Sequence, residues 1–385
     1  MIDHIRQSLE TIAAKDRMRA VRASEMTAGG RIERDGCQLI DFSSNDYLGL
    51  ALHPLLKQRS CEFIERFGAG AGASRLITGT SQAHEDIERQ IAAFKGTEAA
   101  LVMASGWQAN AGVIPALAKA APRTVIFADE LVHNSIHAGC RGAKAEVYFY
   151  RHNDLADLQR LLNDTASTFD GRVVITESVF SMDGDGADLA ALNAIAAEHD
   201  AMLYVDEAHA TGVLGERGAG LTADHPGAGV VMGTFSKALG GFGAYVACSQ
   251  LMRDYLVNMC AGLIFSTAPP PAVLGSMSAA LELVPEMDAE RAHLAALSEQ
   301  LREGLLAMGY DTRGSTTQIV PLVVGAEADA LALGQHLLDR SIAALPIRPP
   351  TVPNGTSRIR FALRSTLSRE DVDHVLSAVA EWRDA

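Results

Sequence analysis

Two short segments carry side chains that could do covalent chemistry. Lys237 lies in the small, mostly uncharged stretch 234–241, directly after the apolar run 230–233. An amine held near a strand end, away from the charged surface, can lose its proton and act as a nucleophile. Upstream, the apolar run 202–205 ends in Asp206, and a buried carboxylate there needs a cationic partner. A cofactor that carries both an aldehyde and a pyridinium nitrogen would use the two groups together.

Other polar residues follow apolar runs in the same way. In open parallel sheets, functional sites form beyond the carboxyl ends of the strands. Five candidate strands end at such groups, which are Gly106 and Trp107, Asp129 and His133, Glu177 and Ser181, Asp206 and His209, and Thr234 and Lys237. We therefore expect these groups to converge on one site.

Each group taken alone also has a plain structural explanation. Lys237 could be a surface lysine, Asp206 a helix N-cap, and His133 a histidine satisfied within the fold. The segment 206–209 spells the acidic box of an ATPase, but the chain has no Gly-x4-Gly-Lys-Ser/Thr phosphate loop. His133 and His137 have the i, i+4 spacing of zinc ligands. No third ligand is evident beside them, so we predict no metal site.

The composition favours a globular protein and excludes some classes of partner. Of 385 residues, 48% are hydrophobic and 21% charged, and the net charge of −14 argues against a nucleic-acid partner. The uncharged stretch 255–281 contains three consecutive prolines, which favours a buried helix, a loop and a second helix over a membrane span. The N-terminus shows no signal-peptide core, and the five cysteines show no C-x-x-C pairing. We expect a cytoplasmic protein with free thiols.

The elements that would position the site alternate along the chain. Apolar runs predict strands at 99–103, 124–127, 146–149, 172–176, 202–205, 230–232 and 244–247, with helical patterns between most of them. This alternation predicts an α/β fold with a mostly parallel seven-stranded sheet sandwiched by helices. The link 233–243 is too short for a helical crossover, so the last two strands should be antiparallel.

The two ends of the chain have different patterns. Residues 1–20 predict an amphipathic helix, followed by a hairpin that ends at residue 42. After Pro285, helices are predicted at 290–308, 329–339 and from Ser368, with antiparallel strands at 319–324, 342–347 and 358–363. We predict an N-terminal helix and hairpin over 1–43, a large domain over 44–285 and a C-terminal α+β domain over 286–385.

Five segments together resemble a known family over nearly the whole chain. They are 43–50, 72–79, 179–184, 205–212 and 234–237. The chain resembles the α-oxoamine synthases, a group of the fold-type-I pyridoxal-phosphate enzymes. The resemblance implies that Lys237 attaches pyridoxal 5′-phosphate and later serves as the general base. It also implies that Asp206 pairs with the pyridine nitrogen, that His133 stacks on the ring, and that Ser181 and His209 bond the phenolic oxygen.

The resemblance assigns further residues to the cofactor and the substrates. Gly106, Trp107 and Thr234 should reach cofactor groups, with Thr234 on the phosphate. Ser266 and Thr267 should reach the phosphate of the partner subunit's cofactor, because sites of this family lie at a homodimer interface. Arg348 and Asn45 should hold the carboxylate of the amino acid, with His133 close to the substrate, while Arg19 and Thr351 should contact the acyl substrate.

Two segments bear on the substrates. Residues 265–271 and 347–353 are most similar to those of the biotin-pathway member of the family. That member joins L-alanine to a pimeloyl thioester, carried on coenzyme A or on an acyl-carrier protein, and releases carbon dioxide and the thiol. A sister enzyme that uses glycine and a short acyl-CoA would keep the same cofactor residues. A non-catalytic protein of the same fold is the alternative of a different class, and the retained Lys237 argues against it.

Overall fold

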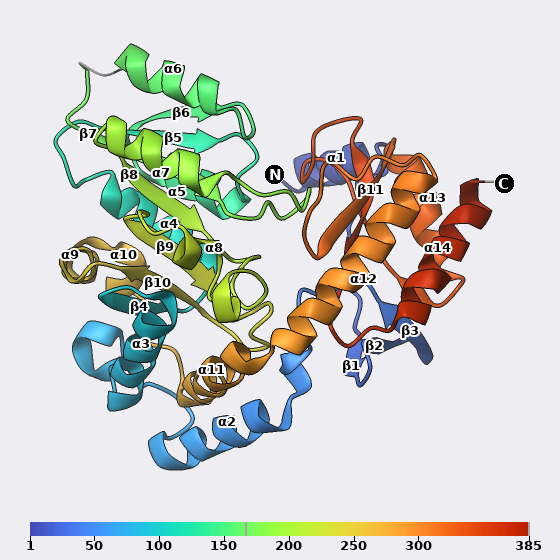
Figure 1. Ribbon diagram of the computed structural model, residues 1–385, viewed down its shortest axis with the longest axis horizontal. Helices are drawn as coiled ribbons and strands as arrows, with labels where there is room; N and C mark the ends of the chain where they lie inside the picture. The colour runs from blue at the N-terminus through green and yellow to red at the C-terminus, as the bar shows by residue number, and fades with distance from the viewer. Residues whose placement is uncertain (166–167, 384–385) are drawn as a thin grey trace. The chain divides into compact units, whose positions relative to one another are not determined.

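The computed structural model describes residues 1–165 and 168–383, and these form two compact units. The larger unit comprises Leu50–Phe180 and Gly186–Arg291, and the smaller unit comprises Met1–Gly49, Ser181–Asp185 and Ala292–Ala385. Figure 1 labels many of the helices and strands of both units. The division at residues 43 and 285 remains a prediction, because a compact unit need not coincide with a folding domain.

The larger unit is built on a seven-stranded sheet of order β4-β10-β9-β8-β7-β5-β6. Its strands are β4 (Ala99–Met103), β5 (Thr124–Asp129), β6 (Glu146–Tyr150), β7 (Gly171–Glu177), β8 (Met202–Asp206), β9 (Val230–Thr234) and β10 (Ala244–Cys248). Strands β6, β5, β7, β8 and β9 are parallel, whereas β10 is antiparallel to both β9 and β4. The seven predicted strands and the antiparallel last pair are confirmed.

Helices cover both faces of this sheet (Figure 1). Side chains alternate between the two faces along each strand, so both faces carry apolar side chains that the helices bury. One face packs on α4 (Gly106–Leu117), α5 (Asn134–Gly142), α9 (Gln250–Met259) and α10 (Ala261–Ile264). The opposite face packs on α6 (Leu155–Thr165) and α7 (Leu189–Glu198). The remaining helices of this unit are α2 (Pro54–Phe67), α3 (Gln82–Lys95), α8 (Leu221–Asp224) and α11 (Pro271–Leu283), and α11 packs against α2 and α3.

The smaller unit holds two sheets. One has the order β1-β2-β3-β12 and the other the order β11-β14-β13. The strands are β1 (Glu25–Thr27), β2 (Arg31–Arg34), β3 (Cys37–Asp41), β11 (Ile319–Gly325), β12 (Ile342–Ala343), β13 (Leu345–Ile347) and β14 (Ser357–Ala362). The helices are α1 (Ile2–Ala13), α13 (Glu327–Leu338) and α14 (Arg369–Arg383), and α12 (Asp288–Ala307) begins in the larger unit.

The prediction of one strand over 342–347 was wrong. The structure divides this segment into β12, which pairs with β3, and β13, which pairs with β14 in the other sheet. Pro346 has no amide hydrogen, and β13 accordingly occupies the edge of its sheet. The predicted N-terminal helix is also shorter than expected and ends at Ala13.

Two observations concern the expected location of the protein. Within the described residues, no helix combines the length and the apolar character needed to cross a membrane. The cysteines Cys37, Cys61, Cys140, Cys248 and Cys260 all carry free thiols.

Candidate active site

Lys237 and His209 meet beyond the ends of two neighbouring parallel strands. His209 follows β8 and Lys237 follows β9, and their Nζ and Nε2 atoms lie 2.9 Å apart. The His209 side chain can accept a hydrogen bond from the amine or donate one to it, depending on its tautomer. An amine held at this distance by a ring is oriented for nucleophilic attack or for proton transfer.

Asp206 is buried at the end of β8, and within the described chain the hydrogen-bond partners of its carboxylate are neutral groups. Its Oδ1 accepts a hydrogen bond from the Ala208 amide at 2.9 Å, and its Oδ2 accepts one from Asn110 Nδ2 at 2.8 Å. Asn110 lies in α4 and is itself held by the Tyr204 hydroxyl, which donates to its Oδ1 at 2.6 Å. Two hydrogen bonds stabilise the carboxylate but leave its charge uncompensated, so the site suits a cationic ligand group.

His133 is linked to this carboxylate through two side chains. Its Nδ1 lies 2.7 Å from Ser135 Oγ, which accepts a hydrogen bond from Asn110 Nδ2 at 2.9 Å. Burial lowers the pKa of His133; the nearby Asp206 raises it, and Lys237 lowers it. The ring is therefore neutral at pH 7. The His133 side chain also accepts a hydrogen bond from the Ser135 amide and so caps the N-terminus of α5. This histidine therefore has a structural role as well.

Glu177 adds a second buried carboxyl group at the end of β7. Burial, and then the negative charge of Asp206, hold the pKa of Glu177 well above its ordinary value. The backbone amide of His133 donates a hydrogen bond to Glu177 Oε1. The raised pKa favours the protonated form of Glu177 beside Asp206.

Gly106 and Thr234 meet at the start of α4. A Cβ atom at Gly106 would lie 2.9 Å from Thr234 Cγ2, so a larger residue would force one of the two segments to shift. The Thr234 hydroxyl is buried, and within the described part of the chain it has no hydrogen-bond partner. It can serve a ligand together with the amides at the helix N-terminus. Trp107 is half exposed beside it.

The predicted residues Ser266 and Thr267 lie in the loop before α11. Thr267 forms an isolated bridge with Ser74, and both residues retain solvent exposure. The described contacts do not join either of them to Lys237 or Asp206.

Apart from His133, which lies in the larger unit, the predicted substrate residues and Ser181 lie in the smaller unit and form two groups. Arg19 Nη2 lies 3.3 Å from Thr351 Oγ1, and both residues line a cavity of about 560 Å³ together with Arg348. Arg348 donates to the backbone oxygens of Asp16 and Met18, the latter at 3.2 Å.

Asn45 and Ser181 share a different arginine. Arg360, buried on β14, donates to Asn45 Oδ1 at 3.2 Å and to the Ser181 carbonyl at 2.5 Å. The sequence reasoning missed Arg360, as it missed Asn110, Ser135 and Tyr204. The alternation of Arg358 and Arg360 within a predicted buried strand was a usable signal, because arginine is rarely buried without a partner.

Comparisons with known proteins agree on one family. Residues 38–379 match the family described as aminotransferase class I and II. The chain is 52% identical to a putative 8-amino-7-oxononanoate synthase of Bordetella pertussis, over 98% of this chain and 96% of that protein. It is 53% identical to the 8-amino-7-oxononanoate synthase of Gluconacetobacter diazotrophicus, over 91% of this chain and 89% of that protein.

Solved structures give the same fold. A serine palmitoyltransferase from S. paucimobilis, with a bound pyridoxal phosphate–myriocin adduct, is 29% identical with a TM-score of 0.89, covering 98% of this chain and 95% of that one. The 8-amino-7-oxononanoate synthase of Francisella tularensis is 25% identical with a TM-score of 0.77, covering 90% and 98%. The fold is that of the fold-type-I pyridoxal-phosphate transferases, as predicted. With most of its length matched, the chain belongs to the aminotransferase class I and II family.

Proposed function

We propose that the protein condenses L-alanine with a pimeloyl thioester, of coenzyme A or of an acyl-carrier protein, to give 8-amino-7-oxononanoate, carbon dioxide and the thiol. This is a step of biotin biosynthesis. The observation that carries the proposal is identity of about half, over nearly the full length, to chains named for this activity. The Lys237–His209 pair beside buried Asp206 supplies the groups that such an acyltransferase needs.

The enzyme depends on pyridoxal 5′-phosphate, and the residues present fit that cofactor. Lys237 supplies an amine for its aldehyde, Asp206 an anion for its ring nitrogen, and Thr234 a buried hydroxyl, without a partner among the described residues, for its phosphate. Gly106 leaves space beside Thr234. When bound, this cofactor supplies an electron sink next to the α-carbon of the amino acid.

The protein's own groups would move the protons. Lys237 Nζ would take the α-proton of alanine, with His209 fixing the direction of the amine from 2.9 Å. The buried Asp206 carboxylate would keep a ring nitrogen protonated opposite it. His133 would present a neutral ring to the cofactor. Trp107 and Ser181 stay proposed cofactor contacts.

The carboxylate of alanine has two candidate partners. The resemblance proposes Arg348 with Asn45, whereas the contacts of this chain join Asn45 to Arg360. Arg360 is also held by the Ser181 carbonyl, so its planar donor group is fixed before any ligand binds. We therefore add Arg360 to the carboxylate-binding candidates.

The cavity beside Arg19 and Thr351 suits an anionic acyl substrate. Its wall combines Arg19 and Arg348 with apolar residues of α13 and of the segment 342–347, and none of the described residues that line it is acidic. An apolar chain that ends in a carboxylate or carries phosphates would match this lining.

A homodimer in the cytoplasm completes the proposal. The helix α1 has apolar side chains at helical spacing, Ile5, Leu9 and Ile12, and each is more than a third exposed. Phe265, directly before Ser266 and Thr267, is 85% exposed. Such surfaces are typical of chains that bury them against a second subunit.

The test is an assay of thiol release by the purified protein loaded with pyridoxal phosphate. We expect alanine with pimeloyl-CoA or a pimeloyl carrier protein to be the preferred pair. The variant Lys237→Ala should lose turnover and the absorbance of the attached cofactor, because it lacks the attaching amine. Preference for glycine with a short acyl-CoA would replace the proposal with the sister activity, and wild-type turnover in Lys237→Ala would overturn the assigned mechanism.

A further inference from the structure

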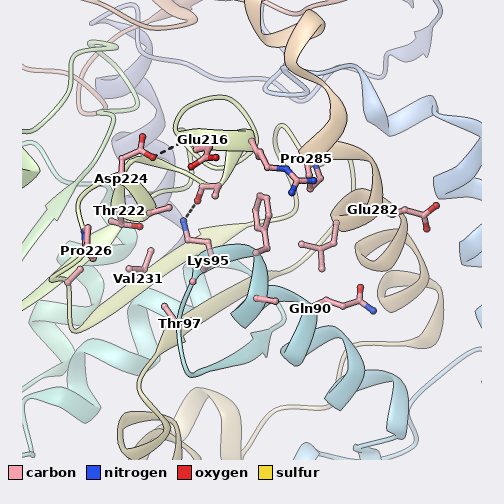
Figure 2. A pocket seen from close by; sticks show the side chains of 18 of the residues that line it. Gln90, Lys95, Thr97, Glu216, Thr222, Asp224, Pro226, Val231, Glu282 and Pro285 are labelled. Carbon is pink, nitrogen blue, oxygen red and sulfur yellow. Dashed lines mark hydrogen bonds between the residues drawn. The ribbon is translucent and has the colours of Figure 1, made fainter.

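Lys95 is a fully buried lysine behind the active-site turn. It is the last residue of α3, which ends at Gly96 in the left-handed conformation. Its ammonium lies 2.5 Å from Glu207 Oε2 and also donates to the Ala219 carbonyl. Figure 2 shows the bond to Ala219, drawn from the labelled Lys95 in the wall of a cavity of about 890 Å³. Neither charged side chain of the Lys95–Glu207 pair has any exposed surface.

Glu207 is held on all sides. Its Oε1 accepts the Thr222 amide at 2.9 Å, and its Oε2 accepts the Thr222 hydroxyl at 2.6 Å. Its own amide donates to the Met232 carbonyl of β9 at 2.7 Å, and its carbonyl accepts the Ala210 and Thr211 amides at 3.0 and 2.9 Å. Glu207 therefore fixes the turn that follows β8 and joins that turn to β9.

This turn carries His209. Asp206 precedes Glu207, and His209 follows it by two residues, with its Nε2 atom 2.9 Å from Lys237 Nζ. Lys237 in turn follows β9, the strand that accepts the Glu207 amide. Glu207 thus contacts both elements that carry the His209 ring and the Lys237 amine, the turn after β8 and strand β9.

We propose that Lys95 is a positioning residue, which anchors Glu207 to the end of α3 and thereby holds the His209 ring against the Lys237 amine. Its effect on turnover rests on the proposed function, whereas its effect on His209 does not. The ammonium acts through Glu207 and touches no reacting atom.

The surroundings of the Lys95 amine stabilise its protonated form. Burial acts to lower the pKa of Lys95, but Tyr245 and Glu207 raise it above its ordinary value. The Tyr245 hydroxyl also lies 2.9 Å from Thr211 Oγ1, in the same turn as Glu207. The ammonium donates to two described partners, Glu207 and the Ala219 carbonyl.

Variants that lack the Lys95 ammonium can distinguish a positioning role of this residue from a role in stability alone. Lys95→Met keeps an unbranched apolar side chain as far as Cε but leaves the Glu207 carboxylate buried without a cation, so the carboxylate must shift or take up a proton. Lys95→Met/Glu207→Gln removes both charges and is the variant to use if the single one does not fold, because neutral pairs of similar volume are well tolerated. Lys119→Met, at an exposed lysine beyond α4, is the matched control.

The experiment has two readouts. In the apoprotein, ¹⁵N NMR would follow the tautomer and the titration of the His209 ring, and in the holoenzyme kcat and the pH titration of the cofactor absorbance would be measured. We expect a changed His209 titration, a shifted absorbance titration and a kcat lower by about 100-fold with little change in KM for alanine, and no change in Lys119→Met. A folded Lys95 variant with the wild-type His209 titration and kcat would overturn the proposal. If wild-type protein lacked synthase activity, the proposed function would fail, and the NMR readout would still decide the role of Lys95.

Discussion

At the residue scale, neutral hydrogen-bond donors orient the buried Asp206 carboxylate. Asn110 gives one amide hydrogen to Asp206 and another to Ser135, and the Tyr204 hydroxyl fixes its orientation. Asn110 and Tyr204 have no exposed surface. Because hydrogen bonds orient the carboxylate without neutralising it, Asp206 keeps its attraction for a positively charged ring nitrogen.

Replacement of Asn110 tests this arrangement. Asn110→Ala removes the donor to Asp206 and leaves the Tyr204 hydroxyl buried without its acceptor. A hydrogen bond to a charged group contributes about 1.5–3 kcal/mol, so we expect kcat/KM to fall by roughly 10- to 100-fold and pyridoxal phosphate to bind more weakly. Steady-state kinetics and an absorbance titration with the cofactor measure the two effects. Asn258→Ala, which loses only an exposed bond to the Asp254 carbonyl, is the control. Equal affinities and rates in the two variants would contradict the assigned role of Asn110.

The functional groups at strand ends could be predicted from the sequence, whereas the residues that hydrogen-bond to them could not. Lys237, Asp206, His209 and His133 follow recognisable strands, so sheet geometry alone predicts that they lie near one another. Asn110 lies inside a helix, and its contact with Asp206 depends on how α4 packs over β8, which no local pattern encodes. The pairing of Asn45 with Arg360 likewise joins residues more than three hundred positions apart.

At the element scale, helix α3 begins with a capping box that contains a histidine. The Ser81 amide donates to His84 Nδ1 at 3.1 Å, and His84 Nε2 lies 3.2 Å from the Pro269 carbonyl. The ring must therefore be neutral, with its proton on Nε2. Burial, and then the nearby Arg75, lower the pKa of His84 to about 4.

Acid should lower the free energy of unfolding through protonation of His84. The unfolded chain binds this proton near pH 6.5 and the folded chain near pH 4, so the contribution of His84 is complete above about pH 6.5 and is lost as the pH falls towards 4. The shift corresponds to a loss of at most about 3 kcal/mol. Urea unfolding of the apoprotein at several pH values should show a smaller acid loss for His84→Gln, since glutamine keeps the capping box. His4→Gln, at an exposed histidine of α1, should behave as wild type, and an acid loss as large in His84→Gln as in wild type would contradict the assignment.

The positions of the strands could largely be predicted from the sequence, whereas the pairing of the strands could not. Continuous apolar runs predicted all seven strands of the large sheet, because buried parallel strands have no polar face. The order β4-β10-β9-β8-β7-β5-β6 depends on contacts between distant segments. The division of 342–347 between β12 and β13 also depends on such contacts, because each half pairs with a different distant strand.

At the scale of the whole molecule, the chain leaves the larger unit after Phe180 for only five residues, Ser181–Asp185. These residues are anchored inside the smaller unit. Asp183 Oδ1 accepts hydrogen bonds from Arg358 Nη1 at 2.6 Å and from Arg313 Nε at 3.1 Å. Gly184 has a φ of +72°, and a Cβ atom there would lie 2.0 Å from the Ile319 carbonyl oxygen, so this passage requires glycine. Thr317 donates to the Gly184 carbonyl at 2.9 Å.

Loss of the Asp183 charge should therefore loosen the smaller unit. The Arg358 side chain is 1% exposed, so Asp183→Asn leaves a buried guanidinium without its counter-ion, which costs about 3 kcal/mol or more. Hydrogen exchange of the β11 and β14 amides reports the opening of this unit, and about 3 kcal/mol corresponds to exchange roughly 100-fold faster. Asp170→Asn breaks the exposed pair with Arg123 in the larger unit and should leave these rates unchanged, because water already screens that pair. Wild-type protection of β14 in Asp183→Asn would mean that the bonds of Arg358 to the Met182 and Thr356 carbonyls suffice to hold it, and that the acidic side chain does not anchor this segment.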